Sequence, residues 1–415
     1  MNLERVYGLT IKNHERILYA EKEVARSTLL PAKANSIIFP RLDLSGDYIR
    51  HEDPITFEID PQIRFIDPVE IETIPKEQVV GGIHLHLPLY QGTWHPRRKQ
   101  ADFEIVRSIK ERSQVIQDIL FQATTVYYEI LKTRELIKNA EEILELTREE
   151  KRVAHVRLEE GAETEDAVLS AEIKILTTES NLIEYRNRLK LLKAVLNRYM
   201  GIDAADYDLA PPAEVTSRNN TLEELVKIAM ESRQDYRKAL SAVDIAESEI
   251  QVAKSRFHPS VNASWDYITV NDPAYYQDEN YWIAGIKLNI PIFEGGSRIW
   301  DLKDKRESLS QTQLLARDLH KGIRIEIEEA MLAVNTLEGI LDNLKKREEM
   351  AEKHYEMVFS KFSFGGASSV ALSDALRTLA LARRELISTT YDHQLAILKL
   401  EKTLGLFAGN YLPRT

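Results

Sequence analysis

The chain has 415 residues, of which 43% are hydrophobic and 29% charged, and this ordinary composition excludes wholesale disorder. Its 66 acidic residues outnumber its 55 basic ones, and the net charge of -11 argues against a basic nucleic-acid-binding surface. The absence of cysteine excludes disulfides, thiol catalysis and cysteine-type zinc sites. No apolar run of about 18 residues occurs, so no transmembrane helix is expected, while the shorter, half-apolar strands of a membrane β-barrel stay open.

Two segments of the chain occur twice. Residues 39–49 (FPRLDLSGDYI) resemble residues 258–268 (HPSVNASWDYI) at an offset of 219, and residues 82–92 (GIHLHLPLYQG) resemble residues 285–295 (GIKLNIPIFEG) at an offset of 203. We therefore predict two copies of one unit. The copies span 1–201 and 221–405, with a linker at 202–220, a C-terminal tail at 406–415, and 16 extra residues between Ile49 and Gly82 of the first copy.

Each copy is predicted to contain a shorter helix (2–35 or 221–257), two strands, and a long helix that turns back into another helix. The strands are expected at about 39–50 and 82–91 in the first copy and at about 259–270 and 281–293 in the second. Alternation places Ile286, Leu288 and Ile290 on one face and Lys287 and Asn289 on the other. Two interpretations remain: a soluble sandwich with one wet face, or a membrane barrel with those apolar residues towards lipid.

Aromatic residues gather at the strand ends away from the helices, as in the interfacial girdle of a membrane barrel. They are Tyr48, Tyr275, Tyr276, Tyr281 and Trp282.

The helical hairpins are expected at 96–200, with its tip at Gly161, and at 297–404, with its tip at Gly365. Residues 97–160 contain no glycine or proline, and apolar residues recur every seven positions from Ile109 to Leu144 and from Ile327 to Leu341. This period predicts supercoiled helix packing. A barrel needs about eight strands or more, so the four strands of one chain are expected to require further copies.

On these features the sequence resembles the TolC-type outer-membrane efflux family over essentially its whole length. The resemblance is carried by the strands that follow Pro40 and Pro259, the G-I-x-L-x-[LI]-P-[LI]-[YF]-x-G segments, the tip glycines and the last helix at 375–405. It implies a mainly α fold with a small β part: a trimeric α-helical tunnel joined to a 12-stranded transmembrane β-barrel.

The resemblance also implies a function. Such a homotrimer is a passive, non-catalytic exit duct of an efflux or secretion system. It lies in the lipid of the bacterial outer membrane, with most of the chain in the periplasm. It docks to a periplasmic adaptor and an inner-membrane transporter. No cofactor, metal ion or nucleic acid is implied.

The same resemblance assigns the tips. It implies that Asp374 lies at the pore entrance. The first tip carries its own run of carboxylates, so Asp166 and Glu163 are also expected at the entrance, although a solvated acidic turn would look alike in sequence. The hairpin tips, with the adaptor contact, are expected at Gly161, Ala162, Gly365 and Gly366. Phe362 and Ala367 stand where the family often has a Tyr–Arg latch, and Ala371 replaces one entrance aspartate.

Other readings find less support in the sequence. His84 and His86 share a strand face, where they would either line a polar lumen or bind a metal ion. No HExxH, P-loop or Ser/His/Asp arrangement is evident. A non-channel coiled-coil structural or adaptor protein of the cell envelope would explain the heptads but not the amphipathic strand pairs. The N-terminus is charged and amphipathic and so differs from a signal peptide.

Overall fold

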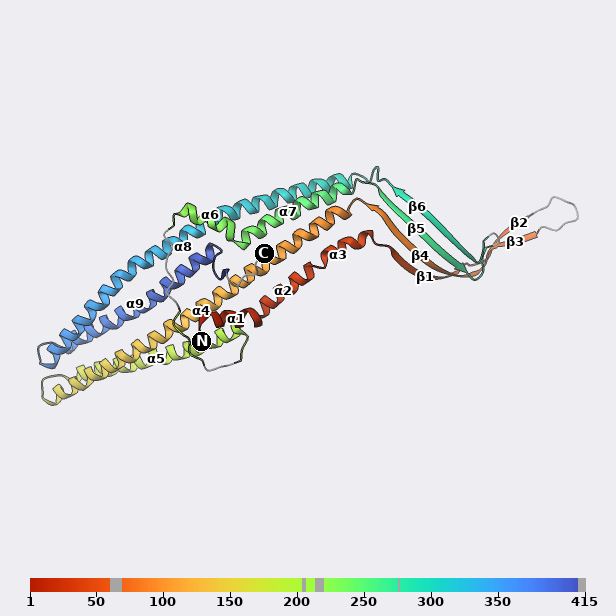
Figure 1. Cartoon of the computed structure of the whole chain (residues 1–415). Coiled ribbons are helices and arrows are strands. Elements are labelled where there is room, and N and C mark those ends of the chain that lie inside the picture. The colour runs from red at the N-terminus through yellow and green to blue at the C-terminus, as the bar shows by residue number, and fades with distance from the viewer. Residues whose placement is uncertain (60–68, 204–206, 213–219, 275–276, 410–415) are drawn as a thin grey trace, which may run out of the picture. The chain divides into compact units, whose positions relative to one another are not determined.

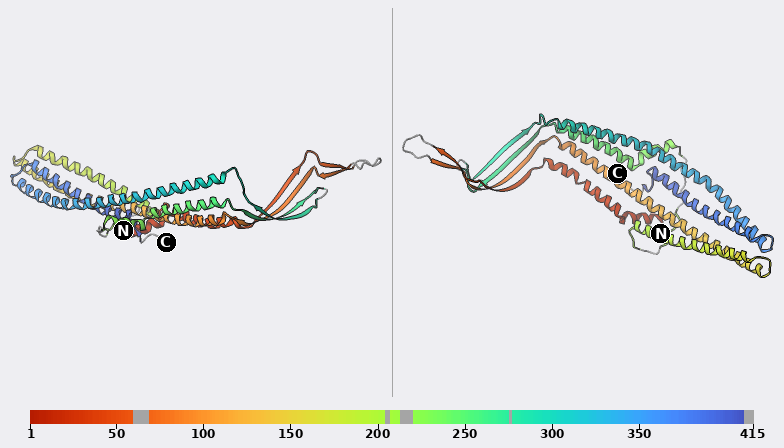
Figure 2. Two further views of the ribbon diagram at one scale, coloured as in Figure 1. Left: turned by 90° about the horizontal axis from the view of Figure 1, so that it is seen from above. Right: turned by 180° about the vertical axis from the view of Figure 1, so that it is seen from behind.

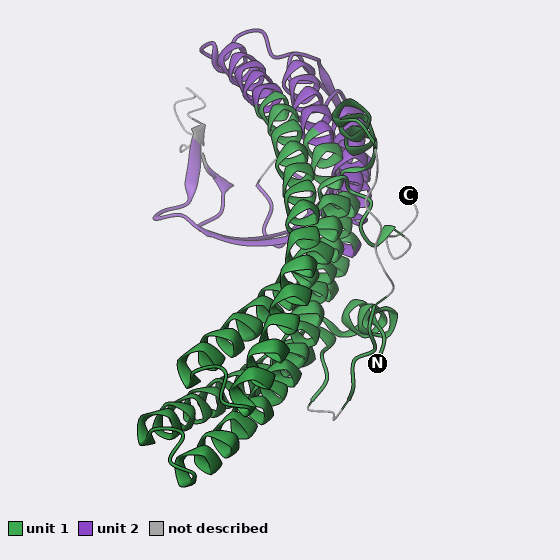
Figure 3. Cartoon of the chain, turned by 90° about the vertical axis from the view of Figure 1, so that its left-hand side faces the viewer, with its two compact units in different colours: residues 1–24, 108–239, 315–415 green, residues 25–107, 240–314 purple. Residues whose placement is uncertain are grey.

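The structure is a computed structural model that describes residues 1–59, 69–203, 207–212, 220–274 and 277–409. The chain divides into unit 1 (residues 1–24, 108–239 and 315–415) and unit 2 (residues 25–107 and 240–314), shown in Figure 3. Among the described residues, no helix combines the length and apolar character needed to cross a membrane.

Two helical hairpins make up most of unit 1. The first joins α4 (Trp94–Glu159) to α5 (Glu165–Met200), and the second joins α8 (Ser297–Ser363) to α9 (Ser369–Thr403) (Figure 1); α4 and α8 both begin in unit 2. The predicted heptad positions are buried along both long helices, which confirms the heptad packing. They include Ile116, Ala123, Ile130, Leu144, Ile327, Val334 and Leu341.

The shorter helices expected at 2–35 and 221–257 are interrupted. The first region forms α1 (Leu3–Asn13), α2 (Glu15–Ser27), α3 (Leu30–Asn35) and a 3-10 turn at Ser36–Ile38, and the second forms α6 (Leu222–Ser232) and α7 (Gln234–Ser255). The backbone is extended at His14 (φ -71°, ψ 122°) and at Arg233 (φ -67°, ψ 125°), which are 219 residues apart. Both copies therefore break at the repeat-equivalent residue.

Close packing explains the positions of these breaks. A Cβ added to Gly201 would lie 2.5 Å from Cβ of Asn13, and one added to Gly405 would lie 2.8 Å from the backbone nitrogen of Arg233. The ends of α5 and α9 thus lie directly against the breaks. A continuous helix at either place would collide with the end of α5 or α9. No proline or glycine in the sequence marks either break.

Unit 2 contains an antiparallel sheet in the order β1 (Arg41–Arg50), β4 (Glu77–Gln91), β5 (Ser260–Val270) and β6 (Asn280–Asn289), visible in Figure 2. Leu85 lies opposite Leu42 on one side and opposite Trp265 on the other. Trp265 lies in turn opposite Ala284. The alternating apolar residues of the four strands therefore share one face of the sheet.

The sequence reading missed a second sheet. Strands β2 (Ile55–Ile59) and β3 (Val69–Ile74) pair within the stretch between Ile49 and Gly82, where only an insertion was recognised. The described residues therefore contain six strands rather than the expected four. Strand β6 ends at Asn289, short of the expected 293, because Pro291 has no N–H to donate to a ladder.

Some expectations fall outside the described residues. They concern Tyr275 and Tyr276 of the aromatic group, residues 204–206 and 213–219 of the linker, and residues 410–415 of the tail.

Glycines in the left-handed region end α4, α5, α8 and α9. They are Gly161 (φ 72°), Gly201 (φ 62°), Gly365 (φ 80°) and Gly405 (φ 75°). In each case the next residue donates its N–H to the carbonyl five positions earlier, for example Leu406 to Glu401 at 2.9 Å. The same cap is thus used at all four helix ends.

Gly405→Ala is expected to destabilise unit 1 by about 3 kcal/mol, because left-handed strain adds to the clash with the backbone of Arg233. Gly161→Ala is the matched control: it has the same backbone strain, but no atom lies within 4 Å of the added Cβ. Its cost should be about 1 kcal/mol. Urea unfolding followed by circular dichroism measures both, and equal losses would contradict the close-packing role of Gly405.

Candidate functional site: the hairpin tips and the amphipathic sheet

The two hairpin tips have the same backbone geometry. Ala162 donates its N–H to the carbonyl of Arg157, and Gly366 donates to the carbonyl of Lys361, both at 2.8 Å. Gly161, Ala162, Gly365 and Gly366 all lie in these loops, between α4 and α5 or between α8 and α9. The described structure therefore places the predicted adaptor contacts at matching turns of unit 1.

Arg157 links the two tips. Its Nη1 donates to the backbone carbonyl of Phe362 (2.7 Å), its guanidinium lies 4.6 Å from the centre of the buried Phe362 ring, and Nη2 donates to the carbonyl of Ala162 (3.2 Å). Glu163 lies 3.8 Å from Nη1, and the two charged side chains are only 13% and 12% exposed. We call this group of Arg157, Phe362, Ala162 and Glu163 the Arg157 clasp.

The predicted entrance carboxylates are divided between two places. Asp166 and Asp374 both line a cavity of about 420 Å³ formed by α4, α5 and α9, whereas Glu163 belongs to the clasp. Arg377 donates to Asp374 at 2.6 Å, and this hydrogen bond holds the pKa of the exposed Asp374 carboxyl below its usual value. Asp374 thus carries its charge beside a cation.

The sequence reading missed a buried ion pair in the same cavity. Glu150 is 4% exposed, and both its oxygens accept from Lys174 Nζ, at 2.9 and 3.2 Å. Burial raises the pKa of Glu150, and the neighbouring ammonium only partly opposes this. A run of acidic residues around position 150 gives no sign that one of them turns inward.

Exposed apolar stripes follow the outer faces of two helices in unit 1. Their spacing is that of a surface for another helix. The stripe on α5 consists of Leu169, Ile173, Leu176 and Ile183, and the one on α8 of Ile325, Leu332, Met350 and Met357.

The main sheet of unit 2 has one apolar and one polar face. On the apolar face Leu44, Ile286 and Leu288 are exposed, Ile286 to 74%, and Ile290 is exposed just beyond the end of β6. On the opposite face Asp43, His84 and Asp266 lie in register across three strands.

The polar face contains a hydrogen-bonded row that the sequence reading did not find. Ser45 Oγ lies 2.9 Å from His84 Nε2, and His84 Nδ1 lies 2.7 Å from Asp266 Oδ1. These residues come from β1, β4 and β5, and are separated by 39 and 182 positions, so no local motif reveals them. Both ring nitrogens of His84 are engaged, and the described residues contain no group of three or more ligands placed for a metal ion.

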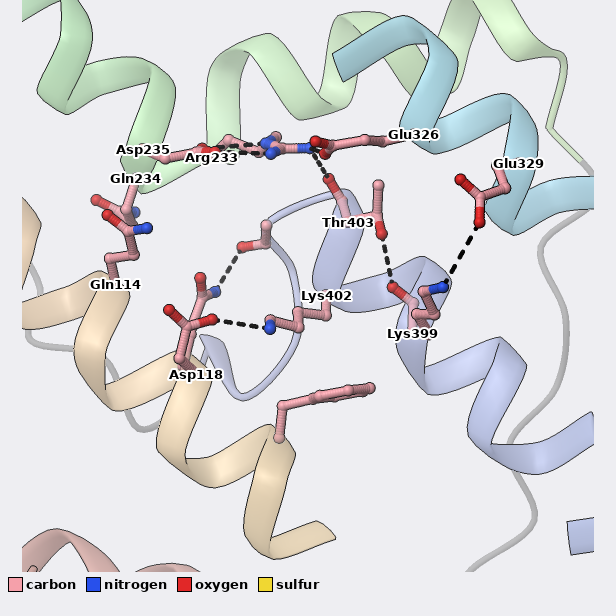
Figure 4. A pocket seen from close by; sticks show the side chains of 13 residues that line it. Gln114, Asp118, Arg233, Gln234, Asp235, Glu326, Glu329, Lys399, Lys402 and Thr403 are labelled. Carbon is pink, nitrogen blue, oxygen red and sulfur yellow. Dashed lines mark hydrogen bonds and ion pairs between the residues drawn. The ribbon is translucent and has the colours of Figure 1, made fainter. Parts of the chain in front are cut away.

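A polar cavity of about 400 Å³ lies at the break between α6 and α7 (Figure 4). Arg233 bonds to Asp235 and Glu326, both at 2.6 Å, and to the carbonyl of Thr403 at 3.2 Å. Burial alone would raise the pKa of Asp235, but the Arg233 guanidinium outweighs burial and holds that pKa low. The charged groups of Arg233, Asp235 and Glu326 pair with one another and stabilise the break between α6 and α7.

Duplicated helical hairpins with heptad packing, together with an open sheet that is apolar on one exposed face, define the class of outer-membrane export channels. The family model "Outer membrane efflux protein" matches residues 6–202 and 225–406, and the chain belongs to this family. This confirms the predicted resemblance and favours a non-catalytic channel over a structural coiled-coil protein.

Individual relatives agree over nearly the whole chain. The chain is 20% identical to the outer membrane protein TolC of Vibrio cholerae, covering 97% of this chain and 90% of that protein. Its fold is similar to that of the outer membrane protein VceC of Vibrio cholerae, with a TM-score of 0.80 at 16% identity, over 97% of this chain and 96% of the other. The Campylobacter jejuni CmeC outer membrane channel gives a TM-score of 0.78 at 15% identity, over 98% and 86%.

Arg157→Ala is expected to loosen both tips, because the clasp joins the first hairpin to the second. Hydrogen exchange should become about tenfold faster at residues 157–165 and also at 360–368. Arg152→Ala is the control, since among the described residues Arg152 pairs only with Glu149 on its own helix. Faster exchange confined to the first tip would show that the clasp does not couple the hairpins.

Proposed function

We propose that three copies of this chain form a passive export duct across the outer membrane. Each copy would contribute its four-stranded sheet to a 12-stranded barrel and its hairpins to a periplasmic α-helical tunnel. The observation that carries the proposal is the exposed apolar face of a sheet whose edge strands, β1 and β6, have free outer edges within the described chain. Twelve is an even strand number with room for a lumen, and closure would remove the open edges.

The helical hairpins support the same assembly. The apolar stripes on α5 and α8 remain exposed in the single chain, and packing between neighbouring copies would bury them. The polar face with Asp43, His84 and Asp266 would then line the lumen. In this proposal the helices of the two repeats, 1–201 and 221–405, form the wall of the tunnel, and residues 202–220 link the repeats.

The tips would form the periplasmic end of the duct. Asp374 and Asp166, with Glu163 nearby in sequence, would surround the entrance in three copies and favour cations there. The loops with Gly161, Ala162, Gly365 and Gly366 would contact a periplasmic adaptor, which in turn would connect the duct to an inner-membrane transporter. The Arg157 clasp would keep the two tips of each copy at a fixed separation.

Membrane fractionation combined with an unboiled gel tests the assembly. The expected product is a heat-modifiable trimer in the outer membrane. A soluble monomer from the full-length exported gene would instead support the coiled-coil structural alternative.

Ile286→Arg should reduce the yield of inserted trimer strongly. A lipid-facing arginine costs about 2–4 kcal/mol near the bilayer midplane, and three copies would carry it. Lys287→Arg is the matched control, because Lys287 already places a cation at the next residue on the opposite face. Trimer yield on unboiled gels measures both, and equal yields would reverse the assignment of the lipid face.

Asp374→Asn should lower the cation selectivity of single channels, whereas Arg377→Gln should raise it. The two residues form an exposed ion pair, so each substitution removes one sign of charge from the same place. Reversal potentials in asymmetric salt give the measurement, with trimer yield as the check on assembly. Unchanged reversal potentials in both variants would show that Asp374 and Arg377 do not line the pore.

A further inference from the structure

The cavity of about 420 Å³ near the tips lies between the two helical hairpins of unit 1. Helices α4 and α5 of the first hairpin and α9 of the second form its wall, so a single chain contains the whole cavity. A cavity of this size is large enough for a small organic molecule. The pore entrance proposed above uses the charges of Asp166 and Asp374 and assigns nothing to the space between the helices.

One face of α5 lines the cavity, and it differs from the face that carries the exposed stripe. Asp166, Ser170 and Lys174 line the cavity and follow one another at four-residue intervals, so they share one face of the helix. The exposed stripe begins at Leu169, one residue before Ser170, and therefore lies about 100° around the helix. Packing between copies along that stripe would use a different face of α5.

Much of the cavity wall is apolar. Ile143, Ala167 and Leu376 line the cavity and are buried in the core that the two hairpins share. Thr147 and Thr178 also line it, and their hydroxyls donate to carbonyls one turn back in their own helices, at 2.8 and 2.9 Å. These hydroxyl groups are thereby occupied, so this part of the wall suits the apolar body of a ligand.

The charged groups of the wall do not balance one another. Its carboxylates belong to Glu150, Asp166 and Asp374, and its cations to Lys174 and Arg377. Glu150 pairs with Lys174 at 2.9 Å, and Asp374 pairs with Arg377 at 2.6 Å. Asp166 is exposed and has no ion-pair partner within the described residues. The wall therefore carries one uncompensated negative charge that a ligand can reach.

We propose that this cavity binds a small organic cation with an apolar body and one primary ammonium group. The body packs against Ile143, Ala167 and Leu376, and the ammonium donates to Asp166, with the hydroxyl of Ser170 as a second acceptor. The single positive charge of the ligand balances the unpaired carboxylate. Because the wall comes from both hairpins, a bound ligand holds α5 against α9.

Three naphthalene compounds of similar size and different charge test the site. Equilibrium dialysis measures the binding of 1-naphthylmethylamine, 1-naphthalenemethanol and 1-naphthoate to the full chain in lipid nanodiscs, with binding to empty nanodiscs subtracted. The wild-type chain should bind the amine about tenfold more tightly than the alcohol, and the naphthoate more weakly than either. Equal binding of all three compounds would overturn the proposal.

Asp166→Asn should weaken binding of the amine about tenfold and leave binding of the alcohol unchanged. Glu165→Gln is the matched control: it also neutralises an exposed carboxylate in the first turn of α5, but Glu165 does not line the cavity. Ala380→Leu enlarges a side chain of the wall and should weaken binding of both compounds together. Equal losses of amine binding in the two carboxylate variants would reveal a general field of the tip and overturn the site.

Hydrogen exchange shows whether the ligand joins the hairpins. At about ten times its dissociation constant, the amine should slow exchange about tenfold at residues 166–178 of α5 and also at 369–380 of α9. Slower exchange in α5 alone would place the ligand outside the cavity and overturn the proposal. These measurements need only one folded chain, so failure of the chain to form an outer-membrane trimer would overturn the duct and leave the cavity to be judged by dialysis.

Discussion

An apolar sheet face that no described part of the chain covers is the constraint on which the rest of this structure depends. Burying apolar surface contributes about 25 cal/mol per Å², so a face that exposes Leu44, Ile286 and Leu288 to water is costly. A soluble protein would place helices over such a face. Here α4 follows β4 and α8 follows β6 in the chain, and these side chains stay exposed in the described structure. In the proposed duct, lipid and other copies of the chain would cover this face.

The two copies share one backbone arrangement at the helix break, but each copy stabilises it with different side chains. Both copies break a helix at the equivalent residue and seal it with a glycine-capped helix end. In the first copy His14 stacks on Tyr199, with ring centres 5.7 Å apart, and burial lowers the pKa of His14. In the second copy Arg233 holds Asp235 and Glu326. One backbone design is thus braced by an aromatic stack in one place and by ion pairs in the other.

Local patterns carried most of what the sequence could predict. The heptad pattern predicted the long helices and the alternation predicted the main strands, because both periods can be recognised among residues that are close together in the sequence. The helix breaks at His14 and Arg233 were missed because their cause is a glycine far along the chain. The Arg157 clasp and the row of Ser45, His84 and Asp266 were missed for the same reason: their hydrogen-bonded partners are up to 205 residues apart. The pairing of β2 with β3 lay in a stretch without repeat partners.

The capped helix ends also limit how the hairpins can change in length. Each returning helix is fixed at its far end, where Gly201 or Gly405 packs against a break, and at its near end by the tip turn. An insertion of one residue in α4 alone would rotate everything beyond it by about 100° and take the heptad seam out of contact. Lengthening is compatible with the packing only when both helices of a hairpin gain about seven residues together. The other hairpin must gain the same length, because the Arg157 clasp joins the two tips. Relatives with longer or shorter tunnels should therefore differ by matched heptads in four places at once.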